Sequence, residues 1–107
     1  MLLFKPEHVP LILNGTKTQT RRNWKRCRVT VGSIQLAKTQ MLSKEYFARI
    51  RIKRVWQEFL MGISEEDARA EGGYTVEEYF RVFDRINPDF DATHVLLWCV
   101  EFEVVRE

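Results

Sequence analysis

The chain has 107 residues, 45% of them hydrophobic and 12% aromatic, so one domain of this length can bury a core without disulfides or bound metals. This composition excludes collagen, coiled coils and intrinsic disorder. No apolar run approaches the roughly 18 residues of a membrane span, and no basic leader precedes an apolar stretch at the N-terminus. We therefore expect residues 1–107 to form a single domain of a cytoplasmic protein with no membrane partner.

The formal net charge of +2 conceals a strong polarity along the chain. Residues 1–54 carry 13 Lys and Arg against two acids, a charge of +11, whereas residues 55–107 carry four Arg against 13 acids, a charge of −9. A basic half is typical of proteins that bind an anionic partner, nucleic acid first among them. The alternative is that the two halves fold onto each other and pair their charges internally.

The first half of the chain predicts mainly strands. Strands are expected at 2–4, 18–22, 33–39 and 46–55, and a short helix is expected from Pro6 to Asn14-Gly15. Pro suits the first turn of a helix and Gly its end. In the strand at 46–55, apolar residues at positions 48, 50 and 52 alternate with basic residues, which predicts one buried and one exposed face.

The second half is acidic and more helical after Trp56. Capping boxes begin at Ser64 and Thr75 and predict helices that end near Glu71 and at Asn87-Pro88. The run from His94 to Val105 predicts a closing strand. Strands interrupted by too few helices for a wound parallel sheet indicate an α+β fold, a small and mostly antiparallel β-barrel with flanking helices.

The densest set of reactive groups follows the first helix. Lys17 comes two residues after Gly15, and Thr20 and Arg22 share one face of the next strand. Lys17 and Thr20 can converge only if Lys17 still lies in the loop. The order helix, Gly, Lys, strand excludes a phosphate-binding P-loop, which needs a glycine-rich loop leading into a helix. The segment is either a basic loop or a catalytic site with an amine, a hydroxyl and a guanidinium.

Glu71 is the second candidate, because it falls in the last turn of a predicted helix, where the helix dipole disfavours negative charge. A carboxylate in this position is simply exposed, or is held by a cation, or keeps its proton, and the last two situations suit acid–base chemistry.

Neither a metal site nor a reactive thiol is expected. Cys27 and Cys99 lie 72 positions apart, and together with His8 and His94 they match no zinc-binding spacing. Arg26 and Arg28 would favour the thiolate of Cys27, but with no His nearby in sequence an ordinary thiol is the preferred interpretation.

The run Gly15-x-Lys17-x-x-Thr20-x-Arg22 resembles the signature loop of the ASCH domain family, relatives of the PUA RNA-binding fold. The helix end Ala70-Glu71-Gly72, the helix that begins at Thr75 and the strand around 98–102 follow in the family's order. The resemblance covers nearly the whole chain. It implies a small PUA-like β-barrel with a cleft at its mouth that binds RNA or modified nucleosides without a cofactor.

One branch of the family is a small, metal-independent amidohydrolase that removes the acetyl group from N4-acetylcytidine. Matched motif to motif, its catalytic Lys, Thr and Glu fall on Lys17, Thr20 and Glu71. Lys17, its pKa lowered by Arg21 and Arg22, would then be the base. Thr20 would attack the amide carbonyl and Glu71 would pass the proton to the leaving amine, while Arg22 neutralises the oxyanion or holds a phosphate.

A binding module without catalysis is the first interpretation, and hydrolysis is the alternative. A basic strand face and an adjacent Trp can track a phosphate backbone and stack a base. The candidate substrate-binding residues are Arg21, Arg22, Trp24, Arg49, Arg51 and Lys53. The basic strand face is also compatible with simple solvation, and a non-catalytic protein-interaction domain is a third possibility.

Overall fold

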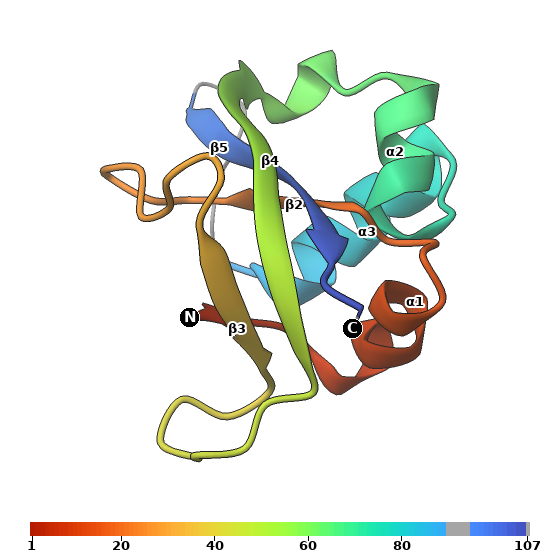
Figure 1. Ribbon diagram of the computed structural model, residues 1–107. Coiled ribbons are helices and arrows are strands. Elements are labelled where there is room, and N and C mark those ends of the chain that lie inside the picture. The colour runs from red at the N-terminus through yellow and green to blue at the C-terminus, as the bar shows by residue number, and fades with distance from the viewer. Residues whose placement is uncertain (90–94, 107) are drawn as a thin grey trace.

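The computed structural model describes residues 1–89 and 95–106. A five-stranded sheet curls into a half-barrel, and the helices gather on one side of it (Figure 1). The strands are β1 (Leu2–Leu3), β2 (Gln19–Arg22), β3 (Ile34–Lys38), β4 (Ala48–Phe59) and β5 (Leu96–Val104). The helices are α1 (Val9–Leu13), α2 (Glu65–Gly72) and α3 (Val76–Ile86), with 3₁₀ turns η1 (Pro6–His8) and η2 (Leu60–Gly62).

The strands are ordered β1-β3-β4-β5-β2, so β1 and β2 form the two edges of the sheet. β1 pairs with β3 in parallel, and the other neighbours are antiparallel. The predicted α+β class and the mostly antiparallel, barrel-like sheet with flanking helices are therefore confirmed. The curl leaves an opening between the two edge strands, and the candidate site lies there.

The two faces of β4 differ as the alternation predicts. Ile50 and Ile52 are buried with Phe102 of β5 and Phe4, and they form the main apolar core. The basic residues at positions 49, 51 and 53 are exposed on the outer face. Because side chains alternate across a strand, the core contacts fix which face carries the charges.

The predicted ends of this strand were wrong at both sides. β4 begins at Ala48 instead of position 46, and it runs to Phe59, past the Trp56 after which helix was expected. The reason is tertiary: the last residues of β4 pair with β5 as far as Leu96, and cross-strand pairing overrides local propensity. A register shift between Ile52 and Arg54 accompanies this length. His94, the predicted start of the closing strand, lies outside the described residues.

Both predicted helix starts are present, but only Thr75 completes a capping box, and Ser64 makes the N-cap hydrogen bond alone. The Ser64 hydroxyl accepts from the Asp67 N–H, and Thr75 and Glu78 satisfy each other's backbone N–H groups. α2 ends at Gly73, which has a left-handed φ of 83° and donates its N–H to the Arg69 carbonyl. In the described part of the chain, no helix is both long and apolar enough to span a membrane.

Candidate functional site

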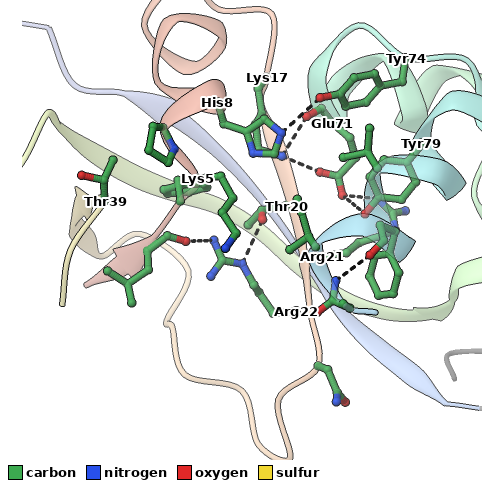
Figure 2. Close-up of a pocket in the computed structure, with 18 residues that line it drawn as sticks. Lys5, His8, Lys17, Thr20, Arg21, Arg22, Thr39, Glu71, Tyr74 and Tyr79 are labelled. Carbon is green, nitrogen blue, oxygen red and sulfur yellow. Dashed lines mark hydrogen bonds and ion pairs between the residues drawn. The ribbon is translucent and has the colours of Figure 1, made fainter. Parts of the chain in front are cut away.

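A cavity of about 430 Å³ lies at the opening of the half-barrel, beside α3 (Figure 2). Its wall combines apolar, aromatic and charged side chains from both edges of the sheet and from the helices. The lining includes Phe4, Lys5, His8, Lys17, Thr20, Arg21, Arg22, Glu71, Tyr74, Tyr79 and Phe83. Lys17, Thr20 and Glu71, far apart in sequence, therefore share one cavity.

Backbone hydrogen bonds hold Lys17 beside the end of α2. Lys17 precedes β2 and lies in the loop, the placement that convergence with Thr20 requires. Its N–H donates to the Leu11 carbonyl at 2.9 Å, and the Thr18 N–H donates to the Ala70 carbonyl at 2.7 Å. The loop is thus fastened to both α1 and α2, so the Lys17 side chain starts within reach of Glu71.

The Lys17 ammonium uses all three of its protons. Nζ donates to the Gln19 carbonyl at 2.8 Å, to the Glu71 carbonyl at 2.8 Å and to Glu71 Oε2 at 2.9 Å. Burial lowers the pKa of Lys17, Arg22 and Arg21 lower it further, and the Glu71 carboxylate opposes the shift. Because a neutral amine would leave one of the three acceptors without a proton, the hydrogen bonds indicate an ammonium at rest.

Glu71 is 1% exposed and has a partner for both carboxylate oxygens. Oε2 contacts Lys17, while Oε1 accepts from the Tyr79 hydroxyl at 2.9 Å and from Arg21 Nη1 at 3.4 Å. Burial and the nearby carboxylate raise the pKa of Tyr79, so its hydroxyl remains a donor. Of the alternatives for Glu71, the structure has the carboxylate held by cations.

Arg21 is surrounded by three acids. Its guanidinium contacts Glu58, Asp67 at 3.6 Å and Glu71 at 3.4 Å. These acids come from β4 and α2, so Arg21 links the sheet to the helix that carries Glu71. A guanidinium with three carboxylate partners is already neutralised, and Arg21 therefore fixes the wall of the cavity.

Thr20 and Arg22 share one face of β2, as the alternation predicts, and both line the cavity. Arg22 Nε donates to Thr20 Oγ1 at 3.0 Å, and Arg22 Nη2 donates to the Leu3 carbonyl at 2.6 Å. The guanidinium also lies 4.9 Å from the centre of the Phe4 ring. Arg22 thereby bridges the two edge strands across the opening of the half-barrel.

The sequence offered no signal for two further polar residues of the cavity, His8 and Tyr74. His8 was considered only as a metal ligand. It is buried, and its Nε2 shares a hydrogen bond of 3.2 Å with the Tyr74 hydroxyl. Burial, followed by the charge of Lys17, lowers the pKa of His8 to about 4. His8 therefore lines the cavity as a neutral imidazole at neutral pH.

The remaining candidates lie outside the cavity lining. Trp24 packs against the main core, with Arg28 5.9 Å from its ring centre. Arg49, Arg51 and Lys53 are on the outer face of β4, where Arg51 pairs with an acid of β5 at 3.4 Å. Within residues 1–89 and 95–106, no three His, Cys, Asp or Glu side chains are grouped to hold a metal.

Three solved structures share this fold. Protein EF3133 from Enterococcus faecalis V583, which carries the family designation DUF984, has a TM-score of 0.74 and 23% identity over 92% of this chain and 67% of its own. An ASCH domain from Lactobacillus crispatus JV V101 has a TM-score of 0.64 and 21% identity, over 90% of this chain and 69% of its own. The hypothetical protein PH0355 has a TM-score of 0.70 and 18% identity, over 95% of this chain and 94% of its own.

These likenesses establish the class of fold, which is that of ASCH domains, as the resemblance of the motifs implied. No protein-family model and no curated protein matches the chain.

Proposed function

We propose that the cavity binds a single nucleoside. The observation that carries the proposal is the cavity wall, which joins aromatic rings to the buried Lys17–Glu71 pair. A cavity of about 430 Å³ has the size of a site for one small ligand. Phe4, Tyr74 and Phe83 offer ring surfaces to a planar base.

The polar groups of the wall suit the edge of a base, which carries both donors and acceptors. The Thr20 hydroxyl and the His8 imidazole can each donate or accept, and Asn23 supplies an amide. A site built of such groups selects a ligand by hydrogen bonding and rejects analogues that leave its buried groups unpaired. This chemistry favours a nucleoside over a purely apolar ligand.

An extended RNA along β4 is less well supported, because the outer face is not uniformly basic. Arg51 pairs with Glu103 at 3.4 Å and Arg54 pairs with Glu101 at 3.3 Å. Acidic side chains of β5 therefore lie beside the basic side chains of β4. Single strands are bound by grooves of one charge. If RNA bound here through six phosphate contacts, log K would fall against log salt with a slope of about −4.

Calorimetric titration with the four common nucleosides and N4-acetylcytidine tests the proposal. Ile86 lines the cavity, whereas Ile34 lies exposed on β3 and away from it. We expect Ile86→Trp to abolish nucleoside binding by filling the cavity and Ile34→Trp to leave it unchanged. Equal affinities in the two variants, or no binding by the wild type at millimolar nucleoside, would overturn the proposal.

Amide hydrolysis is the second candidate, because Thr20 lines the same cavity as the Lys17–Glu71 pair. Arg22 Nε donates to Thr20 Oγ1 at 3.0 Å, and a guanidinium in this position stabilises the alkoxide. The Lys17 proton would first move to Glu71, whose oxygen lies 2.9 Å from Nζ. The neutral amine would then take the Thr20 proton as Oγ1 bonds to the acyl carbon.

In the remaining steps, Glu71 would give its proton to the leaving amine as the C–N bond breaks. Water would then hydrolyse the Thr20 ester, release the carboxylic acid and restore the Thr20 hydroxyl. Incubation with N4-acetylcytidine, followed by chromatography for cytidine and acetate, tests this candidate. Thr20→Ser should retain turnover and Thr20→Ala should lose it, whereas equal rates in the two variants would exclude the Thr20 nucleophile.

A further inference from the structure

Arg22 is a cation of the cavity wall that has no carboxylate partner among residues 1–89 and 95–106. Lys17 and Arg21 both contact Glu71, and Arg21 has further acids around it. Among the residues that the structure describes, no carboxylate lies within ion-pair distance of Arg22. Burial is the main influence on the Arg22 guanidinium and lowers its pKa. A half-buried charge without a counterion loses part of its hydration, which is unfavourable in free energy. An anionic ligand would compensate for that loss.

The hydrogen bonds of Arg22 orient it and leave donors for a ligand. A guanidinium carries five N–H groups. One goes to Thr20 Oγ1 and one to the Leu3 carbonyl, and both acceptors are neutral. Nη1 has no acceptor among the described residues, and it is not one of the buried polar atoms sealed from solvent. Three N–H groups of a fixed guanidinium, two of them on Nη1, therefore remain for a ligand in the cavity.

Lys5 supplies a second positive charge close to Arg22. It follows Leu3, whose carbonyl Arg22 contacts, by two residues, and it is exposed and lines the same cavity. Figure 2 draws Lys5 and Arg22 near each other, on the side of the cavity toward Thr39 and away from Tyr74. The only carboxylate in the described lining is Glu71, which is already held by two cations. This end of the cavity is therefore positive.

We propose that Lys5 and Arg22 form a subsite for a phosphate group, so that the cavity takes a nucleoside monophosphate in preference to the free nucleoside. This inference rests on the proposed nucleoside site and names its ligand class more closely. The base and ribose occupy the part of the cavity near Glu71 and Tyr74, and the phosphate oxygens accept from Arg22 Nη1 and Lys5 Nζ. A guanidinium fixed by other bonds suits phosphate oxygens because it loses little entropy on binding.

Calorimetry with cytidine, its 5′- and 3′-monophosphates and the dinucleotide cytidylyl-cytidine, at one fixed salt concentration, tests the subsite. We expect one monophosphate to bind at least about tenfold more tightly than cytidine, the equivalent of one charge-assisted hydrogen bond. Lys5→Gln should weaken the binding of the monophosphate more than that of cytidine and so reduce this ratio. Arg22→Gln should abolish the preference for the monophosphate over cytidine. Lys53→Gln, on the outer face of β4, should not alter this preference.

The possible failures are distinguishable. Cytidine binding with no gain from either phosphate would overturn the subsite and leave the nucleoside site standing. Tighter binding of the dinucleotide than of both monophosphates would assign the phosphate to an RNA chain and overturn the proposed ligand class. A gain that survives in Lys5→Gln and Arg22→Gln alike would place the phosphate elsewhere. If none of the ligands binds, both proposals fail together.

Discussion

At the residue scale, the Lys17–Glu71 pair dominates the energetics of the cavity. The two side chains are 4% and 1% exposed, and removal of one partner from such a pair strands the other charge away from water. Glu71 retains Arg21 and Tyr79 as partners in that case, so the loss is at the lower end of the range for buried pairs.

Lys17→Met should therefore destabilise the protein by about 3 kcal/mol, measured by urea unfolding at pH 7. Lys53→Met is the matched control, because Lys53 is exposed on the outer face of β4 and surface changes are usually within about 0.5 kcal/mol. If the two variants unfold at the same urea concentration, the buried pair does not carry the stability assigned to it.

His8 makes stability depend on pH. In the unfolded chain a His takes up its proton near pH 6.5, but burial beside Lys17 lowers the pKa of His8 in the folded state to about 4. The unfolded state therefore binds more protons between these values, and stability falls as the pH drops from about 6.5 toward 4. Glu7 and Glu71 oppose the shift, Arg85 adds to it, and Tyr74 shares a hydrogen bond with the ring.

From pH 7.5 to pH 5.0 the wild type should lose about 1–2 kcal/mol more unfolding free energy than His8→Gln. Urea unfolding of both proteins at the two pH values measures the difference. A parallel decline in the two proteins would show that His8 does not resist protonation in the folded state.

At the element scale, the end of α2 positions Glu71. Gly73 ends the helix in a left-handed conformation with φ of 83°, and the Tyr74 N–H returns to the Ala68 carbonyl at 3.3 Å. An ideal Cβ on Gly73 would also lie 3.3 Å from Thr16. Only Gly adopts this region without strain. Gly73 therefore ends the helix two residues after Glu71, and the turn helps to position Glu71 in the cavity wall.

Gly73→Ala should cost about 1 kcal/mol or more of unfolding free energy, because an L-residue is strained at this φ. Gly62→Ala is the control, since Gly62 has no positive φ and nothing within 4 Å of an added Cβ. Thermal unfolding of both variants gives the comparison. Equal melting temperatures would mean that the left-handed turn is not needed to end α2.

Element types were predictable from the sequence where the signal is local. The alternation in β4 and the capping boxes at Ser64 and Thr75 lie within a few residues of the features they predict. The extension of β4 to Phe59 was not predictable in this way, because it depends on pairing with β5, whose residues come nearly 40 positions later. Local propensity does not contain that contact.

The candidate site, too, was predictable from the sequence only where the signal is local. The spacing predicted one strand face for Thr20 and Arg22, whereas it left open the loop position of Lys17 that convergence with Thr20 requires. The role of Arg21 was missed, because its acids come from β4 and α2 and meet only in the folded chain. The recurrence of apolar residues at 76, 79 or 80, 83 and 86 indicates a buried face on α3, but not that the Tyr79 hydroxyl donates to Glu71.

At the scale of the whole molecule, the two oppositely charged halves of the chain meet in the folded protein. All but one of the ion pairs between described residues join the basic half, 1–54, to the acidic half, 55–107. Pairs such as Arg54–Glu101 and Glu7–Arg85 link the two halves at the surface, where exposed ion pairs contribute little to stability. The buried pairs of Lys17 and Arg21 link the halves inside the protein, and Lys5 and Arg22 of the cavity take part in none of the ion pairs between described residues.

A two-dimensional NMR titration of the ¹⁵N-labelled protein with cytidine tests the central claim most directly, that the ligand enters the cavity. We expect shifts in the amides of Thr20, Tyr74 and Phe83, which line the cavity, and none at Arg51 or Lys53. Shifts confined to the outer face of β4, or no shifts at millimolar cytidine, would contradict it.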